Sequence, residues 1–213
     1  MGMFLRRGAV STGPKLGDLD VGTLVKLNEN GSPVEFYVAK HDYESTLNGS
    51  GRTLLARKDC YDNMRFGNSN AYASSTLDAF LTGTYFNLLD ASVREKAGTT
   101  KFYYTPGNGN NTVTTLQRAV FQLSLTELGQ TARYANTEGT ALPIASTLQI
   151  AYRNGAAVGQ WTRTTRTGRT DYVYYISYDG VVYGGSCDLA YCPRPAFCLP
   201  AETKVGDGNL ITG

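Results

Sequence analysis

The chain is poor in charged residues, in tryptophan and histidine, and in long apolar runs. Only 18% of its 213 residues are charged and the formal net charge is +2, so we expect no nucleic-acid partner and no attraction to acidic membranes. No apolar run approaches the length of about eighteen residues that a membrane-spanning helix needs. Residues 1–7 lack the apolar core of a secretory signal. We therefore expect no membrane partner.

The motifs of the common enzyme classes are also missing. The sequence has no Gly-x4-Gly-Lys-Ser/Thr phosphate loop, no Gly-x-Gly-x-x-Gly fingerprint and no Gly-x-Ser-x-Gly elbow. The single histidine, His41, lies beside Asp42 in a polar loop, where a solvated side chain is the ordinary interpretation. No pair of acids stands out for glycosidase chemistry. We expect no catalytic residues and no cofactor.

The four cysteines match no standard metal pattern. Cys187, Cys192 and Cys198 follow a C-x4-C-x5-C spacing, which is not that of a zinc site, and only His41 could assist them. No dense Asp-x-Asp-x-Asp-Gly run suggests a calcium loop. We expect no metal and free buried thiols in a reducing cytoplasm, with a Cys187–Cys192 disulfide as the alternative.

Glycine and tyrosine are abundant, with 24 and 15 residues respectively. This composition favours a β-rich, loop-rich structure over a helical enzyme or a disordered chain. Strands joined by a hairpin are expected at 23–27 and 34–40, and further strands at 53–58, 101–104 and 119–123. With short helices between them, the expected fold class is α+β.

Three short helices are expected from their capping residues. They follow Ser74 or Ser75 and end at Gly83, follow Asp90 and end at Gly98, and cover 125–132 behind a Ser-x-x-Glu capping box of Ser124 and Glu127.

We expect a single domain at 18–205, preceded by an arm at 1–17 and followed by a tail at 206–213. The arm contains Arg, Gly, Ser and Pro14 without periodicity. It would either dock the domain to neighbouring proteins or be an ordinary frayed terminus.

Residues 160–199 form the most distinctive segment. They hold the single tryptophan, Trp161, and six of the fifteen tyrosines, between Tyr172 and Tyr191. Asp179-Gly180 lies between two runs of β-branched and aromatic residues, which predicts a type I′ hairpin with strands at about 172–178 and 181–183. Counting by twos places tyrosines on both faces, so neither face is the apolar stripe of a buried strand.

Tyrosine and arginine among Ser, Gly, Thr and Asp are typical of binding surfaces. Tyrosines would stack on sugar or aromatic faces, and arginines would bind carboxylate or phosphate. The alternative is half-buried strand aromatics with solvated arginines. The expected ligand contacts are Arg163, Arg166, Arg169, Tyr172, Tyr174, Tyr178, Tyr183, Asp188 and Tyr191.

This segment also resembles the C-terminal signature of an uncharacterised domain family, which typically reads W-L-R-S and then G-[IV]-R-P-A-[FL]. Here Trp161-Thr162-Arg163 is followed by a polar loop, a strand, a glycine turn and Pro193-Arg194-Pro195-Ala196-Phe197. Cys192-Pro193 replaces the usual Gly-[Ile/Val]. The resemblance extends over roughly 17–205. Its other segments are Gly17-Asp18-Leu19, Val21-Gly22-Thr23-Leu24-Val25, Leu54-Leu55-Ala56-Arg57-Lys58, Ser75-Thr76-Leu77, Tyr85-Phe86-Asn87 and Ile150-Ala151-Tyr152.

Members of that family occur in phages, prophages and some surface proteins. The resemblance implies a compact C-type-lectin-like or formylglycine-generating-enzyme-like fold with small antiparallel sheets and short helices. The cysteines do not reproduce the catalytic pattern of formylglycine-generating enzymes. Trp161 is expected to be a core anchor. Arg194 is expected to brace the last strand, which includes Phe197, through a buried hydrogen-bonded pair.

The resemblance further implies a phage tail, fibre or decoration protein, made in the bacterial cytoplasm, whose C-terminal hairpin binds a glycan or protein on the host surface. The arm would contact other virion proteins, and a homo-oligomer is expected. A sharper hypothesis is the diversified target of a retroelement that mutates adenines, because residues 163–192 are rich in the residues that altered Asn codons encode. The alternatives are a purely structural virion protein that uses the aromatic hairpin for subunit contacts and, less favoured, a tail-associated carbohydrate-active enzyme.

Overall fold

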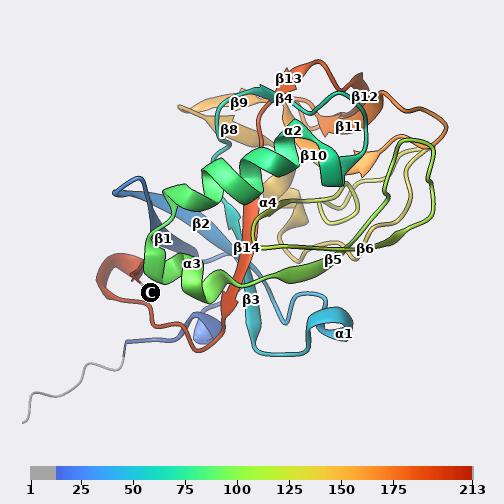
Figure 1. Ribbon diagram of the computed structural model, residues 1–213. Coiled ribbons are helices and arrows are strands. Elements are labelled where there is room, and N and C mark those ends of the chain that lie inside the picture. Colours follow the sequence, from blue (N-terminus) through green and yellow to red (C-terminus); the bar gives the residue numbers. More distant parts are fainter. Residues whose placement is uncertain (1–12, 213) are drawn as a thin grey trace, which may run out of the picture.

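A six-stranded sheet forms the centre of the computed structural model, which describes residues 13–212 (Figure 1). Its strand order is β15-β1-β2-β3-β14-β7, and every neighbouring pair is antiparallel except β1 with β15. The strand predicted at 53–58 is present as β3, in the interior of this sheet. The strands are β1 (Leu24–Glu29), β2 (Ser32–His41), β3 (Arg52–Arg57), β7 (Phe121–Gln122), β14 (Pro195–Pro200) and β15 (Leu210–Ile211).

The first hairpin follows its sequence signal. β1 and β2 pair from Leu24 with Tyr37 to Glu29 with Ser32. Asn30 and Gly31 form the turn with φ of 50° and 77°, and two positive φ angles are what a type I′ hairpin turn requires. Alternate residues of β1, including Val25 and Leu27, are fully buried.

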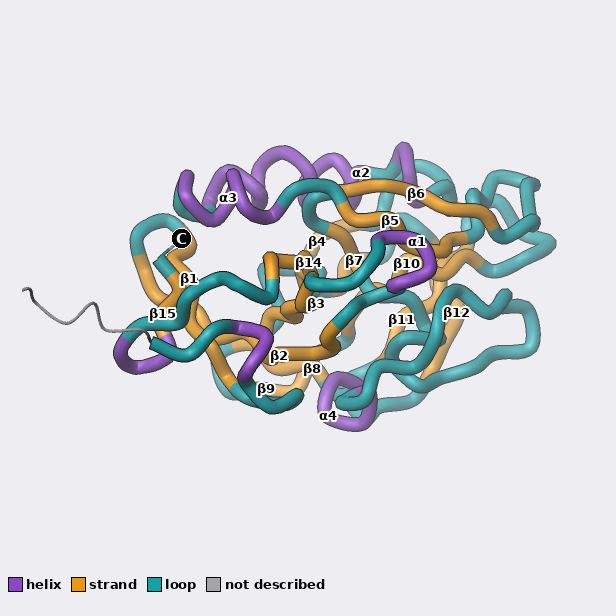
Figure 2. Tube along the Cα trace, turned by 90° about the horizontal axis from the view of Figure 1, so that it is seen from below, coloured by secondary structure: helices purple, strands orange, loops and turns teal. Residues whose placement is uncertain are grey.

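A nearly continuous helical segment crosses one face of the large sheet (Figures 1 and 2). The Ser75 hydroxyl accepts a hydrogen bond from the amide of Asp78 at 2.9 Å, which confirms the predicted cap. The successive helices are α2 (Thr76–Ala79), the π-helical η3 (Phe80–Tyr85), the 3₁₀ helix η4 (Phe86–Leu88) and α3 (Ala91–Ala97). The remaining short helices are η1 (Leu16–Asp18), α1 (Ser45–Asn48), η2 (Tyr72–Ser74), α4 (Ala145–Gln149) and η5 (Asp207–Asn209).

The predicted helix end at Gly83 is wrong, because the helical path continues through it to Leu88. Tyr85, two residues later, is fully buried, and its hydroxyl donates to Glu29. Glu29 also accepts from Arg57 at 2.9 Å. This anchor outweighs the weak helix propensity of a single glycine, which costs about 1 kcal/mol.

The predicted helix at 125–132 is also wrong, although its capping box forms. Glu127 N–H donates to the Ser124 hydroxyl at 3.1 Å, and Ser124 N–H donates to the Glu127 carboxylate at 2.8 Å. The chain makes only turns here and reaches Gly129 with φ of 69°. Because the Glu127 carbonyl accepts from Leu142 N–H at 2.9 Å, the backbone is held by a distant segment instead of by a helix.

Four smaller sheets surround this centre, which confirms the α+β class with several small antiparallel sheets. The three-stranded sheet joins β10 (Gln160–Thr165), β11 (Tyr172–Ile176) and β12 (Val182–Ser186), and the two-stranded sheets pair β4 (Met64–Arg65) with β13 (Ala190–Tyr191), β5 (Thr100–Tyr104) with β6 (Thr114–Arg118), and β8 (Ala151–Arg153) with β9 (Ala156–Val158).

The segments next to both ends of the domain belong to its body. Leu16 is buried, and Lys15 forms a β-bridge with Lys204. Leu210 and Ile211 form the edge strand β15, so the expected tail contributes to the sheet. The rest of the predicted arm, 1–12, lies outside the described residues. Within 13–212, no helix is long and apolar enough to cross a membrane.

Removal of the Ser75 cap provides a test of this fold. Ser75→Ala leaves the amide of Asp78 without its partner, so the free energy of unfolding should fall by about 1 kcal/mol in urea titration. Ser74→Ala is the matched control, because Ser74 donates only a long 3.4 Å bond to a carbonyl oxygen. Equal stability losses in the two variants would contradict the assignment of Ser75 as the cap.

Candidate functional site

The predicted C-terminal hairpin is present and lies at one end of the molecule (Figure 1). β11 pairs with β12 from Tyr172 with Ser186 to Ile176 with Val182. The prediction of a type I′ turn is wrong, because Gly180 has a positive φ of 83° but Asp179 does not. Gly180 N–H donates to the Ser177 carbonyl, and Ser177 N–H donates to the Val181 carbonyl. The turn is therefore the three-residue kind that ends in a left-handed glycine.

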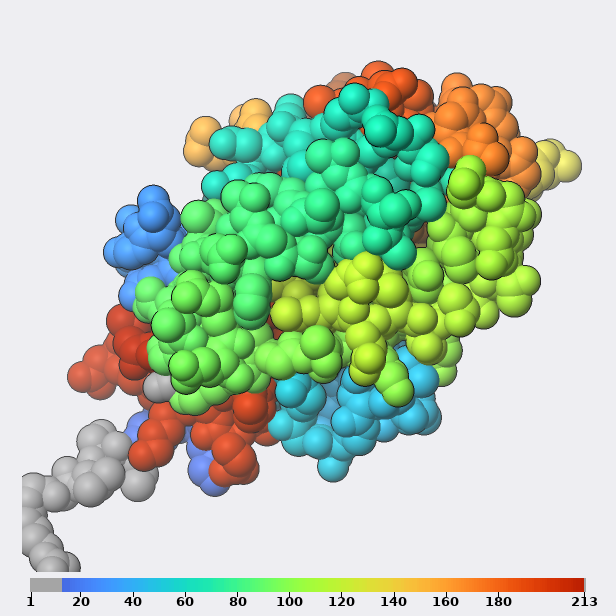
Figure 3. Space-filling model, in the orientation of Figure 1, coloured from blue at the N-terminus to red at the C-terminus, as the bar shows by residue number. Residues whose placement is uncertain are grey.

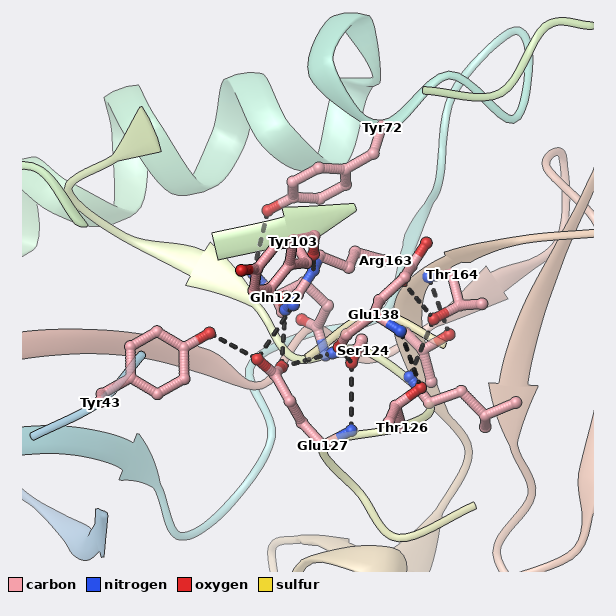
Figure 4. Close-up of polar contacts among 12 residues, drawn as sticks. Tyr43, Tyr72, Tyr103, Gln122, Ser124, Thr126, Glu127, Glu138, Arg163 and Thr164 are labelled. Atoms are coloured by element: carbon pink, nitrogen blue, oxygen red, sulfur yellow. Dashed lines mark hydrogen bonds and ion pairs between the residues drawn. The ribbon is translucent and has the colours of Figure 1, made fainter. Parts of the chain in front are cut away.

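Arg163 does not lie on the surface, which contradicts its predicted ligand contact. All six residues of β10 are buried, and Arg163 is 0% exposed. Its guanidinium donates to Glu127 at 2.6 and 2.9 Å and to the carbonyls of Tyr103 and Gln122 (Figure 4). With its polar atoms turned inward, Arg163 is unavailable to an external ligand.

The charge of Arg163 is stabilised by its surroundings. Burial alone would lower the pKa of Arg163, but the carboxylate of Glu127 raises it above the ordinary arginine value. The hydroxyl of Tyr43 also donates to Glu127. A second buried acid, Glu138, accepts from the Thr105 amide at 2.7 Å and from the Thr164 hydroxyl at 2.7 Å. This polar network joins β10 to the loops at 105 and 124–138.

Tyr174 is also buried, with 5% exposure, so its predicted contact with a ligand is wrong. Its carbonyl accepts from the Thr162 hydroxyl at 2.7 Å. The ring lies on the same face of the sheet as Tyr172 and Gly184, beneath the loop that bears Arg166.

The three predicted structural residues lie in the interior. Trp161 is fully buried and its indole N–H donates to the Met64 carbonyl at 2.9 Å. Phe197 packs edge-on against Phe36 at 5.5 Å. Arg194 is 1% exposed and donates to the carbonyls of Leu148 and Ile150 at the end of α4. Burial lowers the pKa of Arg194, whose hydrogen bonds go to neutral carbonyls and not to an acid.

A row of alternating arginine and tyrosine side chains lies on the surface above Tyr174. The Arg166 guanidinium carbon is 5.0 Å from the ring centre of Tyr134 and 5.7 Å from that of Tyr172. Arg133 lies 5.2 Å from Tyr134 on one side, and Arg169 lies 4.2 Å from Tyr172 on the other. We call these five residues the Arg–Tyr row. Cation–π contacts of this kind hold the side chains in a defined order.

A hollow of about 320 Å³ lies against this row. Arg169 is paired with Asp171 at 2.8 Å, whereas the Arg166 guanidinium makes no hydrogen bond or ion pair with any of residues 13–212. Its donors therefore remain available to a ligand. The lining residues are Asn111, Tyr134, Arg166, Thr167, Gly168 and Arg169.

Buried Asn70 holds the loops around this hollow. Its side-chain amide Nδ2 donates to the backbone carbonyls of Arg169 and Tyr172. Its side-chain Oδ1 accepts from the backbone N–H of Asn108 at 2.7 Å. Thr167 N–H in turn donates to the Tyr134 carbonyl at 2.8 Å. The hollow thus has walls from three separated segments, which are held together by the side chain of Asn70 and by a backbone hydrogen bond between Thr167 and Tyr134.

The opposite face of the hairpin carries a column of stacked tyrosines. Tyr183 stacks on Tyr175 at 5.8 Å, Tyr175 stacks on Tyr191 at 3.9 Å, and Tyr191 meets Trp161 edge-on at 4.9 Å. A Cβ on Gly185 would lie 2.9 Å from the Tyr175 ring. Glycine is required there so that the ring can lie flat on the strand.

The other predicted contacts are dispersed over this end of the molecule. Tyr178, at the hairpin tip, and Tyr183 are 64% and 46% exposed. Asp188 is exposed and paired with Arg65, and exposed ion pairs contribute little stability. Sequence reasoning missed Arg133, Tyr134 and Asn111. Arg133 and Tyr134 form an Arg-Tyr pair in a polar loop, which is the signal that could have drawn attention to them. No sequence pattern places that loop or Asn111 beside the hairpin, because folding alone brings them together.

Within 13–212, no group of three or more His, Cys, Asp or Glu residues could hold a metal ion. All four cysteines are free and buried. Burial raises the pKa of Cys187 and of Cys198 to about 12, so both thiols are protonated at neutral pH.

Comparison with known proteins gives one match. The profile of a domain of unknown function, DUF6273, matches residues 50–201, which include the whole three-stranded sheet. No curated protein and no solved structure matches the chain.

Substitution of the buried Arg163 should lower the stability of the fold. Arg163→Met leaves the Glu127 carboxylate buried without its partner, so the free energy of unfolding should fall by about 3–5 kcal/mol in urea titration. The double variant Arg163→Met/Glu127→Leu should recover part of this loss, because no unpaired charge remains. Strictly additive losses would show that the two side chains are not energetically coupled.

Proposed function

The chain belongs to the DUF6273 family, and we propose that it is a recognition protein of a phage particle whose C-terminal sheet binds a ligand on the host surface. The observation that carries this proposal is the unpaired guanidinium of Arg166, held between two tyrosine rings beside a hollow. The location in a particle rests on the resemblance of the sequence to phage-associated proteins.

The chemistry of the hollow favours an acidic glycan as the ligand. A guanidinium binds carboxylate or phosphate through paired hydrogen bonds, and tyrosine rings offer flat faces for sugars. Arg133 and Arg166 add positive charge to the row, and the neighbouring Asp171 is already paired with Arg169. We therefore propose a saccharide with a carboxylate or phosphate group.

A binding role is favoured over a carbohydrate-active enzyme by the composition of the walls. No carboxylate is among the residues that line this hollow, whereas glycoside hydrolysis uses two acids across the bond that is cleaved. We propose that the site binds its ligand without cleaving it.

Assembly is the second candidate function. β12 has one free edge within the described sheet, and Val181, Tyr183 and Leu189 are each 44–46% exposed beside it. Free strand edges and exposed apolar groups are suited to contacts between subunits. A structural virion protein would use this side of the hairpin in a homo-oligomer.

Two finer hypotheses accompany this proposal. One is a C-type-lectin-like fold, which the small sheets, short helices and long loops support. The other is diversification of residues 163–192 by a retroelement. If diversification occurs, the DNA downstream of the coding sequence should contain a near-repeat of this segment, with changes at codons of exposed residues such as Tyr178 and not at the codon of Arg163.

Removal of one charge in the Arg–Tyr row should weaken binding. The fluorescently labelled protein should bind candidate host cells saturably, and polygalacturonate, a carboxylated glycan, should compete where neutral dextran does not. Arg166→Gln should lower the affinity by about ten- to a hundredfold, because one charge-assisted contact contributes about 1.5–3 kcal/mol.

Lys204→Gln is the matched control, since it removes one exposed positive charge at a distant place in the fold. Its affinity and melting temperature should equal those of the unaltered protein. If the unaltered protein binds no cells yet forms a stable oligomer that Tyr183→Ala disrupts, the structural role is correct and the recognition role is not.

A further inference from the structure

A second and larger hollow lies beside the buried network of Arg163 and Glu127. Its volume is about 550 Å³. The segment around α1 (light blue in Figure 3) forms one side, and the segment with β5 and β6 (green to lime) forms another. The turn at 137–140 completes the walls. It shares no lining residue with the hollow at Arg166.

Glu44 lines this hollow and carries an unsatisfied acceptor. The residue is 7% exposed, and its Oε1 atom has no hydrogen-bond partner in the described part of the chain. Its backbone is left-handed, with φ of 45° and ψ of 54°, a conformation that is uncommon outside glycine. A buried acceptor without a partner costs about 1–3 kcal/mol, and more when it is charged.

Neither of the two neighbouring donors bonds to Glu44 Oε1. Lys40 Nζ, which also lines the hollow, donates to the Thr140 hydroxyl at 2.9 Å, and the Tyr43 hydroxyl donates to Glu127. Gly139, with φ of 86°, lies over the orphan oxygen: a Cβ there would be 2.9 Å from Glu44 Oε1 and 3.6 Å from Glu127 Oε1. Glycine is therefore required here, because the backbone passes close to two carboxylate oxygens.

The electrostatics at this point favour a cation. Burial, and then the charge of Glu127, raise the pKa of Glu44 by more than Lys40, the Thr140 backbone and Arg163 lower it, so the ionised form is only partly compensated. A positive donor beside Glu44 would supply both the missing hydrogen bond and the missing charge. A neutral hydroxyl would supply only the bond.

We propose that this hollow binds a small molecule with a primary ammonium group, which donates to Glu44 Oε1. An ammonium has three donors and no acceptor, so the hydroxyls of Thr46 and Thr137 can accept the others from the walls. Tyr103 and Val113 contact the carbon skeleton of the ligand. The same chemistry is offered by an amino sugar and by the side chain of a free or peptide lysine.

Calorimetric titration distinguishes these sources. Glucosamine and Nα-acetyl-lysine amide are the ammonium probes, and N-acetylglucosamine is the control in which the amine is capped. At least one ammonium probe should bind with a 1:1 stoichiometry. If glucosamine binds, N-acetylglucosamine should bind at least tenfold more weakly. Binding of glucosamine alone indicates an amino-sugar site, and binding of the lysine amide alone indicates an amino-acid site.

Two variants locate the binding. Glu44→Gln should weaken it about tenfold, and Thr46→Trp should abolish it by filling the hollow from an exposed position. Glu202→Gln, at an exposed carboxylate that lies outside this hollow, should bind as the unaltered protein does.

The proposal is overturned if neither ammonium probe binds, if the capped sugar binds as well as glucosamine, or if Glu44→Gln and Thr46→Trp with unaltered melting temperatures both keep full affinity. Arg166→Gln should leave this titration unchanged, so failure here is distinguishable from failure of the surface site.

Discussion

The buried pair of Arg163 and Glu127 is the interaction on which the rest of the structure depends. It joins strand β10 to the turn at 124–127, to the carbonyls of Tyr103 and Gln122 and, through Tyr43, to the segment between β2 and α1. A core tolerates two buried charges only when their hydrogen bonds are satisfied, as they are here. The network extends toward both hollows. Thr164 and Glu138 continue it toward the Arg–Tyr row, and Tyr43 continues it toward Glu44.

The two faces of the C-terminal hairpin have different characters. One face presents Arg166 between two tyrosine rings, with donors that are free for a charged ligand. The other presents stacked rings that lead from Tyr183 at the surface to Trp161 in the core. A polar, charged face suits recognition of a soluble group, whereas a rigid aromatic face suits a second protein surface. Ligand binding and subunit contact can therefore occupy opposite sides of one sheet.

The accuracy of the sequence-based predictions depended on whether the signal was local. The hairpin of β1 and β2, the Ser75 cap and the pairing of β11 with β12 were predicted correctly, because each rests on neighbouring residues. Gly83 and the capping box of Ser124 were misread, because Tyr85 and Leu142 contribute distant contacts that override local preference. Arg163 and Tyr174 were assigned to the surface because residue type does not reveal which face of a strand is covered.

The sequence by itself determined the α+β class, the positions of about half of the strands, the absence of common catalytic motifs and the concentration of tyrosine and arginine near the C-terminus. These properties follow from composition and from spacings of a few residues. Only the tertiary structure decided which arginine is buried and which is available, and it alone brought Tyr134 to Arg166 and Gly139 to Glu44. Such contacts join residues 32 and 95 positions apart, and their geometry depends on the packing of the whole core rather than on any short stretch of chain.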